Sequence, residues 1–384
     1  MNHKENSAPA LTISPRVRKS PYFDATLRSG AKAFTVYNHM YMPTVYTDPV
    51  SEYWRLVTNV TLWDVGCERQ VEITGPDAAQ FVQLLTPRDL STCAVNQCRY
   101  VLLTAADGGI INDAVLLRLA ENHFWLSPGD GDVLLWAEGV ATQAGMQVAI
   151  CEPDVSPLQL QGPAAPEVAR KLFGDVAIEM KYFHLQQLDL DGIPLVLSRT
   201  GWSGELGYEI YLRDGSRGEE LWEKVMTAGQ EQKISPAAPN MIRSIEGGMF
   251  SYSSDITRND NPWTVGLGRL VDLEQDTDFI GKDALKRIHA EGVKRHLVGV
   301  EIDGEPIAGN DALWFVQSDA KVVGYLSRCA YSPRLEKNIG FVNIPAVCAG
   351  IGSRLRIETP SGFADAQVVP VPWFKAETMI PATQ

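Results

Sequence analysis

The sequence lacks the features of several large classes of protein. Lysine and arginine number 34 against 47 aspartates and glutamates in 384 residues, which gives a formal net charge of −13. No basic cluster offsets this excess, although a nucleic-acid-binding protein needs a basic face for the phosphates. The apolar runs, such as residues 132–140, are much shorter than a membrane span, and residues 1–15 lack the apolar core of a signal peptide. We therefore expect a cytoplasmic protein that binds neither nucleic acid nor membranes.

Cysteines are few and scattered. There are six, and the closest pair, Cys93 and Cys98, has no CxxC spacing and no histidine at ligand distance. Neither a zinc site nor a disulfide framework is predicted, and we expect buried, reduced thiols. The chain also lacks a GxGxxG after a strand, a P-loop, an HExxH and a GxSxG. These absences argue against the common dinucleotide, nucleotide, zinc-peptidase and serine-hydrolase sites.

A short pattern of strand, Gly-Pro turn and helix occurs twice. Residues 70–74 alternate as a strand, and residues 75–78, Gly-Pro-Asp-Ala, open a helix with apolar periodicity. Residues 157–161 and 162–165 repeat the arrangement, and Gly174 is placed to end the second helix in the left-handed conformation. Proline suits the first turn of a helix because no N–H is needed there. The pattern favours two α+β subdomains of similar build, with a chance match as the alternative.

The composition changes after a helix predicted from residue 281 to near Gly292. Short alternating runs follow at regular spacing, with turn residues between them: 297–302, 322–326, 339–344 and 355–357. Such runs predict a small β-barrel or sandwich at the end of the chain.

A β-hairpin is predicted around the turn dipeptide Asp107-Gly108, which has apolar runs on both sides. A two-residue loop there places Leu102 opposite Asp113, and Tyr100 becomes the diagonal neighbour of Asp113 on the same face. An unpaired aspartate is costly to bury in an apolar strand. Asp113 and Tyr100 are therefore site candidates. The alternative is an aspartate that caps a loop or lies exposed on an edge strand.

The segment 200–211 predicts a glycine-rich turn followed by a strand. Alternation along that strand places Tyr208 and Ile210 on one face and Glu209 and Tyr211 on the other. A carboxylate beside an aromatic ring can accept paired N–H donors from a flat heterocycle. The alternative is a half-exposed hairpin with a solvated glutamate.

Seven short motifs together resemble the glycine-cleavage T-protein (aminomethyltransferase) family. They occur in the family's order over roughly residues 50–345. The matching runs are Leu62-Trp63-Asp64-Val65, Gly75-Pro76-Asp77-Ala78, Gly108-Gly109-Ile110-Ile111-Asn112-Asp113, Leu160-Gln161-Gly162-Pro163, Thr200-Gly201-Trp202-Ser203-Gly204-Glu205, Gly207-Tyr208-Glu209-Ile210-Tyr211 and Phe279-Ile280-Gly281-Lys282.

This resemblance implies an α+β fold, a three-domain cloverleaf with a C-terminal β-barrel-like domain and tetrahydrofolate in the central channel. The expected boundaries are a flexible N-terminus at 1–20, a folate-binding region at 21–290 made of subdomains at about 21–150 and 151–290, a barrel at 291–374 and a flexible tail at 375–384.

Three departures from the aminomethyltransferase pattern narrow the branch. Trp202-Ser203 stands where the family usually has Tyr-Thr, Pro239-Asn240 replaces an Arg-Asp pair, and Asn112 replaces the first of two aspartates. With residues 36–39, 87–91, 97–100 and 252–256, these departures resemble the dimethylsulfoniopropionate demethylases of the family. Tyr182-Phe183-His184-Leu185 departs from the aromatic-rich run expected there, which bears on substrate preference.

The resemblance implies transfer of a methyl group from a small onium substrate to N5 of tetrahydrofolate, giving 5-methyltetrahydrofolate and 3-(methylthio)propionate from dimethylsulfoniopropionate. A sulfonium is already a good leaving group, so the task is mainly one of positioning. The expected roles are orientation of N5 and proton acceptance for Asp113, pterin binding for Glu209, a wall of the folate site for Tyr100, cation–π contacts for Trp202 and Tyr211, and a further substrate contact for Tyr37.

Two rival functions stay open. The first is demethylation of glycine betaine or another N-methyl compound, because the same aromatic residues serve a quaternary ammonium. The second is a non-catalytic folate-binding protein, although Lys282 is followed by Asp283 and the Lys-Gly-Cys-Tyr signature of that branch is missing. The sequence does not reveal the group that binds the substrate carboxylate, the role of His184 or the oligomeric state, for which a homodimer is one option.

Overall fold

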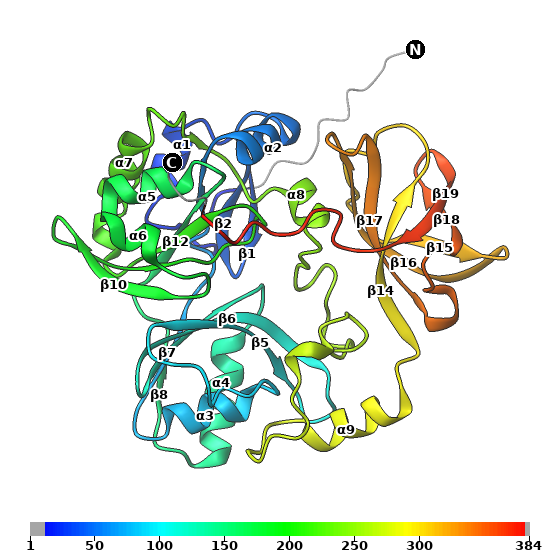
Figure 1. The fold of residues 1–384 in the computed structure, drawn as a ribbon, viewed down its shortest axis with the longest axis horizontal. Coiled ribbons are helices and arrows are strands. Elements are labelled where there is room, and N and C mark those ends of the chain that lie inside the picture. The colour runs from blue at the N-terminus through cyan, green and yellow to red at the C-terminus, as the bar shows by residue number, and fades with distance from the viewer. Residues whose placement is uncertain (1–11, 381–384) are drawn as a thin grey trace.

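The computed structural model describes residues 12–380, in which three units surround a common centre (Figure 1). The first unit holds a six-stranded sheet in the order β10-β11-β12-β9-β3-β13. Its strands are β10 (Leu185–Leu190), β11 (Ile193–Ser198), β12 (Gly207–Leu212), β9 (Ser156–Gln161), β3 (Thr61–Asp64) and β13 (Ser235–Pro236). The helices of this part of the chain are α1 (Phe23–Arg28), α2 (Pro49–Thr58), α5 (Ala165–Phe173), α6 (Asp175–Glu179) and α7 (Gly218–Ala228).

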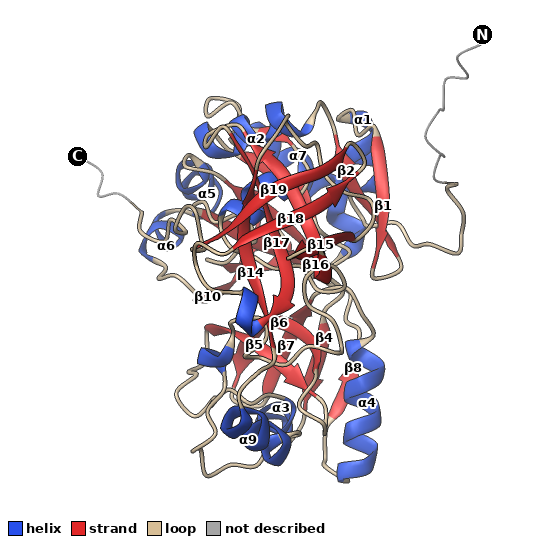
Figure 2. Cartoon of the chain, turned by 90° about the vertical axis from the view of Figure 1, so that its right-hand side faces the viewer, coloured by secondary structure: helices blue, strands red, loops and turns tan. Residues whose placement is uncertain are grey.

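The second unit holds a five-stranded sheet in the order β5-β6-β7-β4-β8. Helices α3 and α4 pack on one face of it, as Figure 2 shows, and Phe81 and Ala137 lie in that core. The elements are β4 (Val71–Thr74), α3 (Ala78–Leu85), β5 (Gln97–Thr104), β6 (Ile110–Ala120), β7 (His123–Pro128), α4 (Val133–Ala144) and β8 (Ala149–Cys151). A separate hairpin, β1 (Ala33–Tyr37) and β2 (Met40–Val45), precedes α2.

The third unit is a closed barrel, which confirms the predicted C-terminal barrel. Its strands in order around the barrel are β14 (Arg295–Ile302), β17 (Lys337–Pro345), β16 (Lys321–Ser332), β15 (Trp314–Ser318), β18 (Arg354–Thr359) and β19 (Gly362–Val369). Helices α8 (Met241–Glu246) and α9 (Lys282–Glu291) lie in the connection that leads to it. The α+β cloverleaf predicted from the sequence is therefore the observed fold.

The two Gly-Pro units occupy equivalent places in the two sheets. Gly75 follows β4 with φ of 124°, and Gly162 follows β9 with φ of 130°. A Cβ at either glycine would lie 2.5 Å from a backbone carbonyl oxygen of a neighbouring segment. Glycine is therefore required twice, for the positive φ and for the close approach. Pro76 and Pro163 of the two Gly-Pro pairs precede the helices, which begin at Ala78 and Ala165. These prolines therefore lie before the first helical turns, in which they were predicted to lie.

The boundary expected at about residue 150 does not separate the strands of the two sheets, because a strand that lies before this residue belongs to the first sheet. Strand β3 precedes every strand of the second sheet, yet it pairs with β9 in the first sheet. Helix α5 ends at Gly174, as predicted, but with φ of 73° and ψ of −161°, outside the left-handed helical conformation.

Both ends of the described chain form hydrogen bonds with the body of the molecule, at positions within the segments expected to be flexible. The backbone N–H of Glu377 donates to the carbonyl of Gly204, and Arg199 donates to the carbonyl of Thr378 at 2.8 Å. Figure 1 shows this last segment running from the barrel back to the first unit. Near the other end, the Ser20 hydroxyl donates to Asp64 at 2.5 Å. Residues 1–11 and 381–384 of the expected ends lie outside the described residues.

The six cysteines are all free, as predicted. The expectation of burial was wrong for Cys151, which is exposed on the short edge strand β8, and for Cys348, which is half-buried. None of the helices within residues 12–380 has the length and apolar character needed to span a bilayer.

Candidate active site

Asp113 and Tyr100 meet on the predicted hairpin. Strands β5 and β6 pair so that Leu102 lies opposite Asp113, which confirms the register, and the Tyr100 hydroxyl donates to Oδ2 of Asp113 at 2.7 Å. The turn itself is longer than predicted, because the register shifts between Leu103 and Thr104. Strand β6 is an interior strand, so the alternative of an aspartate on an edge strand is wrong.

One oxygen of Asp113 is buried and has no hydrogen-bond partner among the described residues. This oxygen, Oδ1, would lie 3.1 Å from a Cβ built on Gly129, so the bare glycine backbone passes close to the carboxylate. Burial raises the pKa of Asp113 to about 6, and the hydrogen bond from Tyr100 opposes the rise. A buried acceptor without a donor is costly, and a ligand N–H can satisfy it.

Glu209 lies inside the six-stranded sheet. Strand β12 has neighbours on both sides, and the Glu209 side chain is buried. Gln159 donates to Oε1 at 2.8 Å, while Tyr211 at 2.8 Å and the Thr200 hydroxyl donate to Oε2. Burial raises the pKa of Glu209, and these hydrogen bonds act in the opposite direction. The carboxylate is therefore rigidly oriented, and the alternative of a solvated glutamate on a half-exposed hairpin is wrong.

The predicted alternation along β12 is confirmed, but Tyr211 lies in a buried core next to Glu209. Tyr208 and Ile210 belong to the core on one face of the sheet, and Tyr211 belongs to a second core on the other. The Tyr211 ring is fully buried against Trp125, with ring centroids 6.1 Å apart, and only its hydroxyl reaches the carboxylate. The hydroxyl of Tyr211 therefore orients Glu209, and its ring, which was predicted to contact the substrate cation, is covered by protein.

Glu68 is a site residue that the sequence did not suggest. It lies in the connection from β3 to β4, and Gln159 donates to both Glu68 Oε1, at 3.3 Å, and Glu209. Ser127 donates to the second oxygen of Glu68 at 3.3 Å. Burial and the nearby Glu209 raise the pKa of Glu68 well above its usual value. No motif signals this glutamate, because its proximity to Glu209 arises from the pairing of β3 with β9.

Tyr37 lies at the end of β1, beside the same acidic groups. Its pKa is raised well above the usual value, mainly by burial and then by Cys67, Glu68 and Asp113. The next residue, Asn38, has a positive φ of 48° and fixes the loop after β7, donating to the carbonyl of Gly129 at 3.2 Å. The β1–β2 hairpin therefore brings Tyr37 close to Glu68 and Asp113.

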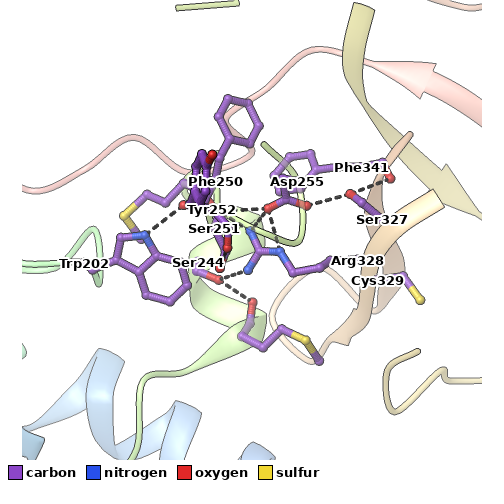
Figure 3. A network of polar contacts seen from close by, with 12 residues as sticks. Trp202, Ser244, Phe250, Ser251, Tyr252, Asp255, Ser327, Arg328, Cys329 and Phe341 are labelled. Carbon is purple, nitrogen blue, oxygen red and sulfur yellow. Dashed lines mark hydrogen bonds and ion pairs between the residues drawn. The ribbon is translucent and has the colours of Figure 1, made fainter. Parts of the chain in front are cut away.

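Trp202 is held at two points. Its indole N–H donates to the carbonyl of Phe250 at 3.1 Å, and its backbone N–H donates to Gln159 at 3.3 Å. The guanidinium of Arg328, from barrel strand β16, lies 5.7 Å from the centroid of the Trp202 ring (Figure 3). Tyr252 follows Phe250 in the same loop, and its hydroxyl donates to the carbonyl of Ile110 at 3.1 Å.

The acidic residues of the site have no basic counterpart among residues 12–380. None of the ion pairs within 4.0 Å in this part of the chain includes Asp113, Glu68 or Glu209. The buried pairs there are Arg243–Glu205 and Arg328–Asp255, while Arg334–Glu246 joins a half-buried arginine to a buried glutamate. Such a site favours a ligand that brings N–H donors or positive charge.

Family models match almost the whole described chain. The GCVT N-terminal domain matches residues 22–275, and the glycine cleavage T-protein C-terminal barrel domain matches residues 295–375. The chain belongs to the glycine-cleavage T-protein family. The resemblance inferred from the sequence is thus confirmed. The family also agrees with the predicted class, a tetrahydrofolate-dependent enzyme that transfers methyl groups.

Two relatives and one solved structure illustrate the position of the chain within the T-protein family. Dimethylsulfoniopropionate demethylase DmdA of Ruegeria pomeroyi is 37% identical over 355 residues, covering 92% of this chain and 97% of that protein. An aminomethyltransferase of Symbiobacterium thermophilum is 31% identical over 378 residues, covering 95% and 99%. The glycine cleavage system aminomethyltransferase T of Bartonella henselae has the same fold, with a TM-score of 0.85, 22% identity and coverage of 94% and 99%.

Two residues at which the sequence departs from an expected pattern, one from that of the aminomethyltransferases and one from that of the demethylases, have local structural roles. Asn240 caps helix α8, accepting from the backbone N–H of Arg243 at 3.1 Å, so the changed Pro-Asn pair begins a helix. His184 lies beside the edge strand β5, 3.3 Å from the side chain of Gln97, and its other ring nitrogen lies 3.2 Å from the carbonyl of Tyr182. Neither residue contacts Asp113 or Glu209.

Proposed function

We propose that the chain demethylates dimethylsulfoniopropionate, transferring a methyl group to N5 of tetrahydrofolate. The observation that carries the proposal is the pairing of Tyr100 with Asp113, which leaves one buried carboxylate oxygen free. The 37% identity to a dimethylsulfoniopropionate demethylase supports the sulfonium as donor. The absence of basic partners for the acidic residues within residues 12–380 supports a cationic substrate.

The residues present fit tetrahydrofolate. The free Oδ1 of Asp113 is a buried acceptor in need of a donor, and Glu209 is a carboxylate fixed by three side-chain donors. Reduced pterins carry N–H donors on their edges, so Glu209 would hold the pterin by charge-assisted hydrogen bonds. Asp113 would face N5, and Tyr100 would form the wall beside it. When bound, tetrahydrofolate supplies N5 as the nucleophile.

The contribution of the protein is mainly positioning and proton acceptance. In the proposed reaction the bond from the methyl carbon to sulfur would break as the methyl group passes to N5, and the electron pair of that bond would stay on the thioether product. No acid is needed for that leaving group. Asp113 would accept the proton that N5 loses, and a carboxyl with a pKa of about 6 is ionised at neutral pH and able to do so. Trp202 and Tyr37 would hold the sulfonium in line with N5.

A donor panel tests the proposal. The purified protein is incubated with tetrahydrofolate and, in separate reactions, dimethylsulfoniopropionate, glycine betaine, dimethylglycine or glycine-derived aminomethyl donors. We expect 5-methyltetrahydrofolate and 3-(methylthio)propionate in equal amounts with the sulfonium alone. Turnover with betaine in place of the sulfonium would favour a quaternary-amine demethylase. Folate binding without product from any donor would favour a binding protein.

A further inference from the structure

A buried ion pair joins the C-terminal barrel to the wall of the site behind Trp202. Arg328 of β16 donates to Asp255 through Nε at 2.7 Å, to the hydroxyl of Ser244 at 3.1 Å and to the carbonyl of Met249 at 2.7 Å. The side chain of Asp255 is completely buried and that of Arg328 is 9% exposed. Figure 3 shows the guanidinium between this network and the indole of Trp202.

The network fixes the indole on one side. The guanidinium of Arg328 lies 5.7 Å from the centroid of the Trp202 ring, and the indole N–H is bound to the carbonyl of Phe250. Asp255 holds the same loop, because its Oδ2 accepts from the backbone N–H of Ser251 at 2.9 Å. One face of the ring is therefore occupied by the guanidinium, so an onium that binds the indole would contact the opposite face.

Charge gives Asp255 a second role. A guanidinium beside Trp202 would by itself repel an onium that binds the same ring. Asp255 lies against that guanidinium, and its other oxygen accepts from Ser327 at 2.6 Å, so the pair is neutral and satisfied by hydrogen bonds. An uncompensated guanidinium, 5.7 Å from the ring centroid and therefore about 10 Å from a cation on the opposite face, would weaken binding of that cation by roughly tenfold to thirtyfold, taking an effective dielectric constant of about 20.

We propose that Asp255 and Arg328 are positioning residues that orient Trp202 and keep its surroundings neutral, so that a cationic methyl donor is accepted. This assignment rests on the proposed function in that it takes an onium as the ligand of Trp202. It makes the barrel a part of the substrate site. A purely structural link between the barrel and the loop at 249–255 would have the same contacts, but it would not distinguish charged from neutral ligands.

Asp255→Asn separates the two roles. Asparagine keeps a side-chain oxygen for Arg328 and removes the negative charge. We would measure the dissociation constants of dimethylsulfoniopropionate and of 4-methylpentanoate, in which a neutral carbon replaces the sulfonium, together with KM and kcat for the sulfonium. The variant should bind the sulfonium about tenfold to thirtyfold more weakly, with a change of less than about threefold for the neutral isostere and little change in kcat.

Two further variants control for folding and for general loss of a barrel ion pair. Arg328→Met with Asp255→Asn removes both charges and should recover part of the affinity for the sulfonium. Glu301→Gln removes an acidic residue that pairs with Lys337 and accepts from the indole of Trp373 at 3.3 Å, away from the site, and should change neither constant. Tetrahydrofolate affinity and the melting temperature report whether each variant is folded.

The outcomes separate this inference from the proposed function. Equal loss of affinity for both ligands in Asp255→Asn, or no loss for either, would overturn the inference. Selective loss for the cation supports it, and this readout needs binding only. Absence of methyl transfer by the unmodified protein would instead overturn the proposed function.

Discussion

The pKa of Asp113 leads to a specific prediction about pH dependence. Burial raises this pKa to about 6, and the hydroxyl of Tyr100, 2.7 Å from Oδ2, opposes the rise by stabilising the ionised form. Since Asp113 is proposed to accept the proton of N5, only the ionised carboxylate is active. We expect kcat/KM for methyl transfer to fall about tenfold for each pH unit below about pH 6.

Tyr100→Phe should move this acidic limb upward. A hydrogen bond to a charged group is worth about 1.5–3 kcal/mol, and one pKa unit corresponds to about 1.4 kcal/mol. Loss of the hydroxyl should therefore raise the pKa of Asp113 by about 1–2 units, to about 7–8. At pH 7 the ionised fraction then falls from about nine-tenths to between a half and a tenth, so activity should drop about twofold to tenfold and recover at pH 9.

The assay is the initial rate of 5-methyltetrahydrofolate formation between pH 5 and 9 at low substrate. Asp113→Asn should have little activity and no acidic limb near pH 6. Tyr331→Phe, which alters a tyrosine of barrel strand β16, is the matched control and should keep the limb near pH 6. If the limb of Tyr100→Phe stays at pH 6 or moves lower, Asp113 is not the group that titrates, and the proposed proton acceptor is wrong.

Three further predictions follow from the same structure. Because the pKa of Asp113 is about 6 in the folded protein against 3.8 for a free carboxyl, the folded protein loses stability as the pH rises from about 4 to about 6, where only the unfolded chain is ionised. Asp113→Asn should therefore raise the free energy of unfolding in urea by about 3 kcal/mol at pH 7 and by almost nothing at about pH 3, and an equal gain at both pH values would contradict this. Trp202→Ala should raise KM for the onium about tenfold, consistent with a cation–π contact of about 0.5–2 kcal/mol, and an unchanged KM would remove Trp202 from substrate binding. Deletion of residues 375–384 removes the contacts of Glu377 and Thr378 with the 199–204 segment and should weaken onium binding a few-fold, whereas unaltered binding would show that the tail does not support the site.

Local pattern was sufficient for much of the fold and for the main acidic residues. The register that pairs Leu102 with Asp113 follows from the hairpin, and the opposite faces of Ile210 and Tyr211 follow from strand alternation. Both rest on the two-residue period of a strand, which acts over a few residues and is visible in the sequence.

Short-range pattern could not reveal contacts between distant segments. The bridge through Gln159 from Glu68 to Glu209 depends on β3 crossing into the first sheet, and Arg328 reaches Trp202 only because the barrel packs against the central loop. The same limit applies to Tyr211, since alternation assigns its face but does not reveal that Trp125 covers its ring.

The sequence by itself therefore determined the strands, the Gly-Pro turns, the family and the presence of Asp113 and Glu209 on defined faces. Only the tertiary structure decided which side chains surround these carboxylates. Periodicity reports the direction of a side chain relative to its own strand. The partner that buries or neutralises it comes from packing between residues that, in the case of Trp202 and Arg328, belong to different units of the molecule.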